Sequence, residues 1–188
     1  AFRHRLAAFP AAPEEPIRAE LFSVERLEQH GESLALAQRI ASKPTIDRRL
    51  TKRLRDNDRV LRAAYVAIAE AIQEERTVTP AADWLVDNFH VVDEQVHEIR
   101  SDLPPGYYRQ LPKLADGPLK GYPRVFGLAW AFVAHTDSRF DPQMLVRFIG
   151  AYQRIEPLTI GELWAVAITL RIVLVENLRR LAEAIVRN

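Results

Sequence analysis

The chain of 188 residues contains no cysteine, which excludes disulfides, thiolate metal sites and cysteine nucleophiles. Glycine is also scarce, with 7 residues in the whole chain. Neither G-x-G-x-x-G nor G-x-x-x-x-G-K-[ST] can be built from their positions, so the two commonest glycine-dependent phosphate sites are excluded. These glycines are Gly31, Gly106, Gly117, Gly121, Gly127, Gly150 and Gly161.

Long apolar runs and an excess of one charge are missing as well. The clearest uncharged stretch, from Val125 to Thr136, has about a dozen residues, whereas a membrane-spanning helix needs about 20. Lys and Arg number 26 against 25 Asp and Glu, and 48% of the residues are hydrophobic. This composition is that of an ordinary soluble globular domain with no strongly charged partner. Because residues 1–16 carry several prolines and no long apolar core, we expect a flexible arm there rather than a signal peptide, followed by a helical domain over 17–188.

Hydrophobic periodicity predicts about six helices. A Thr-Pro pair at 79–80 and an Asp-Pro pair at 141–142 each combine an N-cap with a first-turn proline, and Thr159 with Glu162 fits a capping box. The last helix is apolar around most of its circumference in its first half, so we expect other helices to surround it. No alternating strand pattern occurs, and the predicted fold class is all-α, a single bundle-like domain around this helix. The predicted helices span 17–41, 45–75, 80–101, 124–135, 142–154 and, for the last, about 25 residues from 160.

Several long phrases of the sequence resemble a known family. They occupy residues 15–30, 84–90, 102–113, 131–140 and 158–165, and in this order they are similar to the N-terminal region of bacterial cyclic β-1,2-glucan synthases. The resemblance implies a very large inner-membrane protein that joins a glucosyltransferase using UDP-glucose to a phosphorylase-like region. No position of this chain matches the catalytic motifs of that family. The resemblance therefore implies no catalytic residue, metal or cofactor in this segment.

The role that follows is a non-catalytic scaffold or docking domain on the cytoplasmic face of the bacterial inner membrane. Its partners would be the remaining domains of the synthase. One alternative is a carbohydrate-binding or substrate-guiding module that contacts glucan. Another is an independent small enzyme, for which the sequence offers no convergent set of acid, base and nucleophile.

A basic stripe on the predicted second helix is the first candidate interaction surface. Its spacing of four, three, four and three residues places the charges on one helix face. Such a stripe could meet anionic inner-leaflet lipid or a neighbouring domain, or be an ordinary solvated face. No aromatic residues are interleaved for base stacking, so nucleic acid is not an expected partner. The stripe consists of Arg48, Lys52, Arg55, Arg59 and Arg62.

The proline-rich connection over 103–123 is the second candidate. It presents Tyr107, Tyr108 and Arg109, residue types that suit sugar stacking or protein docking. The alternative is that the tyrosines turn inward and pack against the helices, with their hydroxyls bonded to loop carbonyls.

Two further features have a structural explanation. Glu94 and His97 reproduce one Glu-x-x-His motif, but a di-iron site needs two such motifs, so we expect a solvated face there. Arg171 lies among apolar neighbours of the last helix, and we expect it to be largely buried against a carboxylate or helix-end carbonyls.

Overall fold

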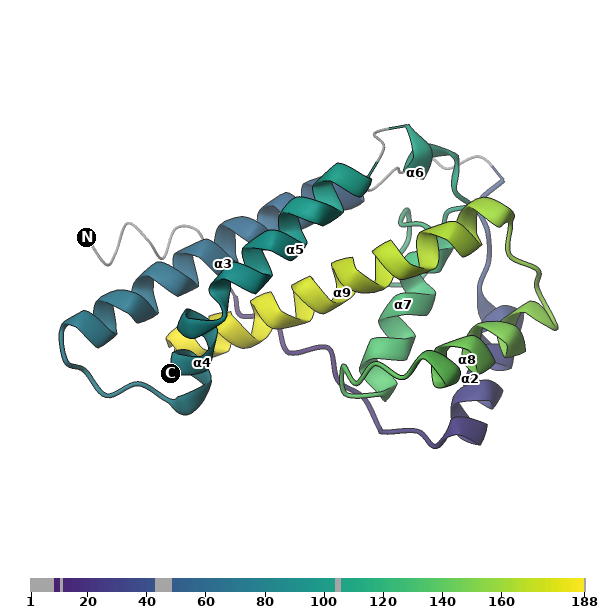
Figure 1. Cartoon of the computed structure of the whole chain (residues 1–188). Coiled ribbons are helices and arrows are strands. Elements are labelled where there is room, and N and C mark those ends of the chain that lie inside the picture. The colour runs from purple at the N-terminus through teal and green to yellow at the C-terminus, as the bar shows by residue number, and fades with distance from the viewer. Residues whose placement is uncertain (1–8, 11, 43–48, 104–105, 188) are drawn as a thin grey trace. The chain divides into compact units, whose positions relative to one another are not determined.

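The computed structural model describes residues 9, 10, 12–42, 49–103 and 106–187. Within these ranges it contains helices and no β-strand (Figure 1), which confirms the predicted all-α class. Extended pairing there is limited to the isolated bridges Ile40–Leu114 and Lys113–Pro123. The described helices are α2 (Val24–Ala37), α3 (Leu50–Gln73), α4 (Pro80–Asp87), α5 (Phe89–Asp102), α6 (Tyr107–Gln110), α7 (Arg124–His135), α8 (Pro142–Gln153) and α9 (Ile160–Arg187).

The chain divides into two compact units. Unit 1 consists of Ala1–Pro16, Thr51–Asp102 and Val175–Asn188, and unit 2 consists of Ile17–Leu50 and Leu103–Leu174. Helix α9 contributes its first half to unit 2 and its second half to unit 1. The interpretation of 17–188 as one domain after a flexible arm stays a prediction.

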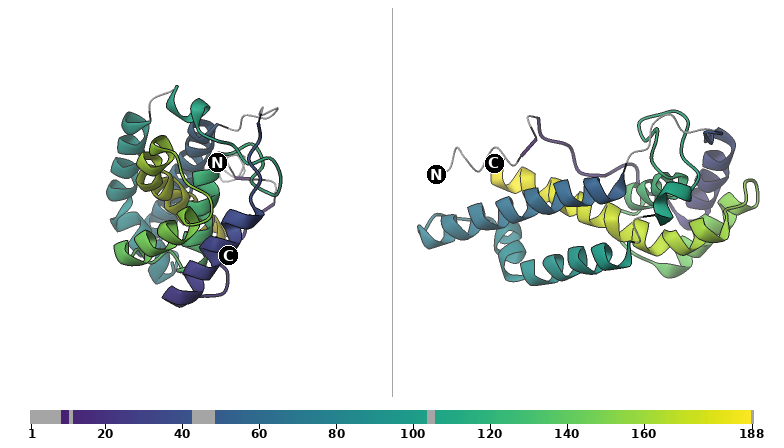
Figure 2. Two further views of the ribbon diagram at one scale, coloured as in Figure 1. Left: turned by 90° about the vertical axis from the view of Figure 1, so that its right-hand side faces the viewer. Right: turned by 90° about the horizontal axis from the view of Figure 1, so that it is seen from above.

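In unit 2, helix α2 lies against α8 (Figures 1 and 2). Their close approach depends on Gly31, because a Cβ atom there would lie 2.8 Å from the carbonyl oxygen of Phe148. Helix α7 has a nearly continuous buried surface, including Phe126, Leu128 and Phe132. Burial of this kind is the main favourable term in folding, so α7 provides much of the core of the unit.

In unit 1, helices α3 and α5 and the second half of α9 are joined by ion pairs and an apolar core. Leu54 and Leu61 of α3 and Ile99 of α5 are essentially inaccessible to solvent. Asp58 of α3 accepts a hydrogen bond of 2.7 Å from Arg100 of α5. This unit therefore combines an apolar interior with charged contacts between its helices.

Two of the predicted helices have different bounds in the structure. The first begins at Val24 rather than Ile17, because the Ser23 hydroxyl caps it by accepting from the backbone N–H of Arg26 at 3.3 Å. The preceding segment is extended and donates to the C-terminal carbonyls of α7, through Ala19 at 3.0 Å and Phe22 at 3.1 Å. The prediction for 17–41 was therefore too long at both ends.

The helix predicted over 80–101 is two helices, α4 and α5, separated at Asn88. The side-chain amide of Asn88 donates to the carbonyl oxygen of Trp84 at 2.9 Å, which terminates α4. The predicted cap Thr79 is confirmed by its hydrogen bond from the Ala82 amide, and Asp141 caps α8 as expected. The predicted beginning of the second helix, over 45–48, lies outside the described residues. None of the described helices combines the length and apolarity that crossing a membrane requires.

Candidate functional site

The first turn of α9 is held by the predicted capping box. The Glu162 amide donates to the Thr159 hydroxyl at 3.2 Å, and the Glu162 carboxylate accepts from the Thr159 amide at 2.9 Å. Both bonds satisfy groups that a helix terminus otherwise leaves unpaired. The capping box is therefore confirmed.

The same carboxylate binds an arginine from another helix. Arg124, the first residue of α7, donates to Glu162 through Nε at 2.8 Å and through Nη2 at 2.6 Å. The side chains of both residues are at most 3% exposed. Burial disfavours the charged guanidinium, but the hydrogen bonds and charge of Glu162 outweigh it, so the pKa of Arg124 is raised.

Other groups complete the surroundings of Arg124. The Pro157 carbonyl accepts from it at 3.3 Å, as does the Glu156 carboxylate. The guanidinium carbon also lies 5.7 Å from the centre of the Tyr152 ring. A buried arginine with this many partners fixes the angle between the beginnings of α7 and α9.

The tyrosine loop closes against the same turn. The Tyr107 hydroxyl donates to the carbonyl oxygen of Gly161, and both Tyr107 and Tyr108 pack against a core cluster formed by Leu111, Val125 and Ala165. Arg109, by contrast, is exposed. These contacts favour the inward packing that the sequence left open for the tyrosines, while a docking role for this loop stays a prediction.

The hydroxyl of Tyr108 is buried and makes no hydrogen bond of good geometry with any described residue, and neither does the hydroxyl of Thr169. Burial raises the pKa of Tyr108 to about 12, and the nearby Thr169 hydroxyl offsets only part of this effect. The Tyr108 ring therefore contributes as an apolar group, with its phenol protonated at neutral pH.

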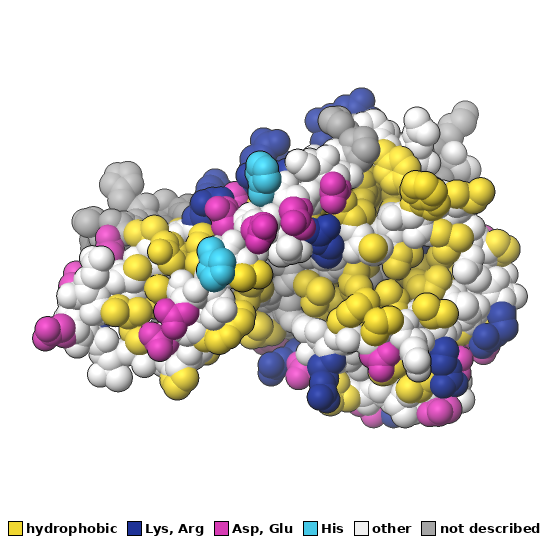
Figure 3. All heavy atoms as spheres, viewed as in Figure 1, with side chains coloured by type: hydrophobic (Ala, Val, Ile, Leu, Met, Phe, Trp, Pro, Cys, Tyr) yellow, Lys and Arg dark blue, Asp and Glu magenta, His cyan; other side chains and the backbone are white. Residues whose placement is uncertain are grey.

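An apolar face remains exposed at the beginning of α9. Ile160 is 75% exposed, Leu163 38% and Trp164 79%, and their spacing of three and four residues places them on one side of the helix. Figure 3 shows hydrophobic side chains gathered over this half of α9. We expected other helices to surround this segment, but only one side of it is covered. Glu162 and Ala165 on that side are fully buried.

The basic stripe lies on α3, except for Arg48, which is outside the described residues. Lys52, Arg55, Arg59 and Arg62 are all exposed. Lys52 pairs with Asp56 at 3.1 Å, and Arg62 pairs with Asp58 at 3.0 Å and with Asp93. These acidic neighbours reduce the positive field of the stripe, and its contact with anionic lipid stays a prediction.

Helix α5 presents its histidines and acidic residues outward, as expected. His90, Glu94 and His97 are exposed, and Figure 3 shows acidic and histidine side chains along this helix. Among the described residues, no three histidine or carboxylate side chains are grouped so that they could hold a metal ion. Arg171 is partly buried, less than the sequence led us to expect.

A buried charged network in unit 1 was not predicted. Glu176 of α9 accepts hydrogen bonds from Arg53 of α3 and, at 2.8 Å, from Arg180. One turn later, Arg179 donates to Glu183 at 3.1 Å and to Glu14. Desolvation raises the pKa of Glu176, but Arg53 and Arg180 outweigh it and lower that pKa overall.

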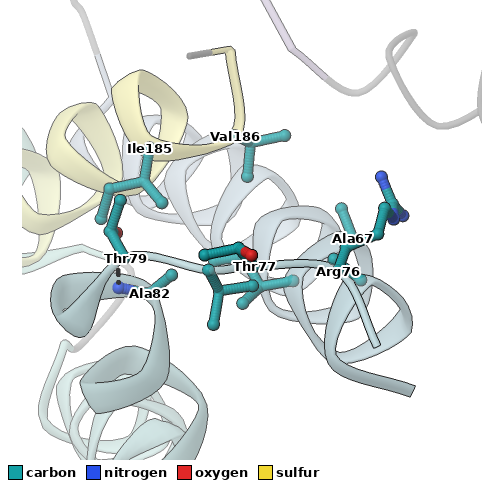
Figure 4. A pocket seen from close by; sticks show the side chains of 10 residues that line it. Ala67, Arg76, Thr77, Thr79, Ala82, Ile185 and Val186 are labelled. Atoms are coloured by element: carbon teal, nitrogen blue, oxygen red, sulfur yellow. Dashed lines mark hydrogen bonds between the residues drawn. The ribbon is translucent and has the colours of Figure 1, made fainter. Parts of the chain in front are cut away.

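Unit 1 also contains a hollow of about 310 Å³ between α3, α4 and the end of α9 (Figure 4). Its walls are mainly apolar, with Ala67, Ile185 and Val186 among them. The Thr79 hydroxyl on its wall already accepts from the Ala82 amide at 3.2 Å. The hollow therefore offers few polar groups to orient a ligand.

The chain is similar to part of a much longer known protein. The chain is 40% identical over 173 residues to the cyclic beta-(1,2)-glucan synthase NdvB of Rhizobium meliloti (strain 1021). The match covers 92% of this chain and 6% of that protein. No protein-family model matches the chain. The resemblance predicted from the sequence phrases is confirmed, and it concerns a small part of a much longer relative.

Proposed function

We propose that this chain acts as a non-catalytic docking domain within a cyclic β-1,2-glucan synthase. The observation that carries the proposal is the 40% identity to the Rhizobium meliloti synthase over 92% of this chain. Because the matched region is 6% of that relative, the partners that fit best are the other domains of the same protein. In such a synthase the domain would lie on the cytoplasmic face of the inner membrane.

The exposed face of Ile160, Leu163 and Trp164 supports docking as the role. Large apolar side chains exposed together are typical of protein interaction sites, and tryptophan is among the residues that most often dominate binding energy. The buried pair of Arg124 and Glu162 holds the same helix turn in place. A rigid apolar surface loses little entropy when a partner covers it.

A chimera tests the proposal. The matched region of the Rhizobium meliloti synthase is replaced by this chain, and cyclic glucan is quantified in cells that produce the chimera. We expect deletion of the region to abolish glucan synthesis, and the chimera to restore it. If the deletion leaves synthesis intact, the region is dispensable and the docking proposal is wrong.

Variants of the chimera locate the surface. Ile160→Arg combined with Trp164→Arg should lower glucan synthesis while leaving the melting temperature of the separate 188-residue chain almost unchanged, since both side chains are exposed. The matched control is Val146→Arg on α8, where the apolar side chain is 71% exposed. Equal losses in the two variants would count against a specific surface on α9.

A measurement on the purified chain separates docking from catalysis. The chain alone should release no UDP from UDP-glucose above the level of a heat-inactivated sample. Release above that background would make the chain an enzyme in its own right, the alternative that the sequence analysis left open.

A further inference from the structure

Helix α9 carries a stripe of side chains with the seven-residue repeat of coiled coils. Its positions are separated by four, three, four and three residues, the spacing that keeps side chains along one seam of a helix. All of them lie in unit 2. This α9 stripe consists of four apolar residues and one arginine, namely Ile160, Trp164, Ala167, Arg171 and Leu174.

The α9 stripe faces outward. Its first three residues are exposed and its last two are partly buried, and Figure 3 shows apolar side chains at the surface over this half of the helix. The described part of unit 2 therefore leaves this side of α9 open.

The opposite side of α9 buries polar residues. Glu162 and Thr169 lie seven residues apart, and both are 0% exposed. The same spacing continues in unit 1 with Glu176 and Glu183, which are also 0% exposed. A surface helix normally turns its apolar side to the core and its polar side to water. Because α9 buries a line of polar residues and exposes an apolar stripe, the stripe has the character of an interface rather than of a solvated surface.

The repeat indicates the shape of the partner. A period of 3.5 residues is that of two packed α-helices, in which each seam residue inserts between residues of the facing helix. The side chains of an extended segment alternate every second residue, which does not match this spacing. Ala167, in the middle of the stripe, leaves room for a large apolar side chain from a facing helix.

The charge within the stripe limits the partner further. A helix that covers the stripe removes water from the guanidinium of Arg171. The five N–H donors of an arginine need acceptors when they are desolvated. The facing side of the partner helix should therefore be apolar except for an acidic side chain near Arg171.

We propose that the α9 stripe binds one amphipathic α-helix from another region of the same synthase, with an apolar repeat of four and three residues and an acidic side chain near Arg171. This inference rests on the proposed docking function and specifies its partner. The Rhizobium meliloti relative is long enough to supply such a helix, since the match covers 6% of it.

Photo-cross-linking in the chimera with the Rhizobium meliloti synthase tests the inference. The photoreactive amino acid p-benzoylphenylalanine replaces Ile160 or Ala167, one at a time, and mass spectrometry locates the cross-linked residues. The two positions are about 10 Å apart along α9. We expect both to react with one segment of the same chimera chain outside residues 1–188, at sites about seven residues apart.

Other cross-link patterns would contradict the inference. An extended partner would place the two sites about three residues apart. Cross-links to lipid, to a second chimera chain or only within residues 1–188 would identify a different occupant. The absence of any cross-link would show that the stripe has no partner.

A variant of the stripe makes the test specific. Trp164→Arg should lower the yield of the cross-link from Ala167 about tenfold, because a central tryptophan often dominates the energy of an interface. The control Val146→Arg, exposed on α8, should leave that yield unchanged. Equal yields in the two variants would show that no helix docks on the stripe.

This test and the deletion test of the docking proposal can fail separately. The deletion test measures glucan, whereas photo-cross-linking measures the positions of contact. If the region is needed for glucan synthesis but its cross-links lack the seven-residue spacing, docking stands and the helical partner is wrong. If the region is dispensable for synthesis, the docking proposal itself is wrong.

Discussion

Arg124 and Glu162 are 38 residues apart in sequence and are joined by two hydrogen bonds of 2.8 and 2.6 Å. Glu162 also accepts from the Thr159 amide. One buried carboxylate therefore fixes the first turn of α9 and connects it to the first residue of α7. The exposed apolar face of α9 begins at the same turn. The position of this face therefore depends on the pair of Arg124 and Glu162.

Replacing Arg124 with methionine should strongly destabilise the chain. The substitution leaves the carboxylate of Glu162, which is 0% exposed, without its charged partner. Breaking a buried pair in this way costs about 3–5 kcal/mol. Urea unfolding followed by circular dichroism measures the change in the free energy of unfolding.

The control for this prediction is a pair at the surface. Arg147 binds Glu28 at 2.8 Å, but its side chain is 48% exposed. Arg147→Met should therefore cost no more than about 1 kcal/mol. Similar costs for the two variants would show that the Arg124 pair is screened by solvent, contrary to its burial.

Tyr108 should behave as a core residue. Its ring packs against Leu111, Val125 and Ala165, so we expect Tyr108→Ala to cost about 2–4 kcal/mol. Tyr108→Phe should be nearly neutral, because the hydroxyl makes no hydrogen bond of good geometry with the part of the chain that the structure describes. Arg109→Ala, at an exposed position, should change the stability by less than about 0.5 kcal/mol. If Tyr108→Ala is as mild as Arg109→Ala in thermal melts, the ring is free to serve in docking instead.

The helix ends that sequence analysis located correctly are those with a local cause. Asp141 and Pro142 define the beginning of α8 because an N-cap and a first-turn proline act within a few residues of each other. The beginning of α2 was misplaced, since Ile17 to Phe22 continue the apolar pattern but bond to the end of α7. Periodicity cannot distinguish an extended apolar segment that pairs with a distant helix from one more helical turn.

The candidate site was only partly predictable for a related reason. The capping box predicted a role for Glu162 but no partner on another helix. Arg124 lies at the beginning of a very apolar helix, and this position indicates that its charge needs a buried partner. The apolar composition of α9 predicted that Arg171 is largely buried, yet this residue is only partly buried. Which carboxylate meets which arginine is decided by helix packing, which a single sequence does not specify.

His30 should make unit 2 less stable in mild acid. Its ring lies 4.6 Å from the ring of His135 and 5.4 Å from that of Phe22, and Arg26 lies over Phe22. Burial, and then the charge of His135, lower the pKa of His30 below 6.5. A folded-state pKa below the unfolded one means that the unfolded chain binds the proton first, so stability falls as the pH drops below about 6.5.

His30→Phe keeps a ring at this position and removes its titration. Between about pH 7.5 and 5.5, this variant should lose less stability in urea unfolding than the unmodified chain. His97→Gln on α5, where the side chain is exposed, is the control and should follow the unmodified chain. A parallel pH dependence of His30→Phe and the unmodified chain would assign the acid sensitivity to another group.

Glu176 should control the stability of unit 1 at lower pH. Its side chain is 0% exposed and bonded to Arg53 and Arg180, and its pKa is lowered below 4.5 because the arginines outweigh desolvation. For a carboxyl group with a lowered folded-state pKa, the stabilisation is present above the unfolded pKa and is lost as the pH falls through the folded one. Glu176→Gln, which cannot ionise, should therefore cost up to about 3 kcal/mol at neutral pH. The difference in the free energy of unfolding between Glu176→Gln and the unmodified chain should shrink steadily below about pH 4.5 in urea unfolding.

The control is Glu94→Gln, exposed on α5, which should lose little stability at either pH. A gap for Glu176→Gln that stays constant into acid would mean that its loss comes from altered packing rather than from the missing charge.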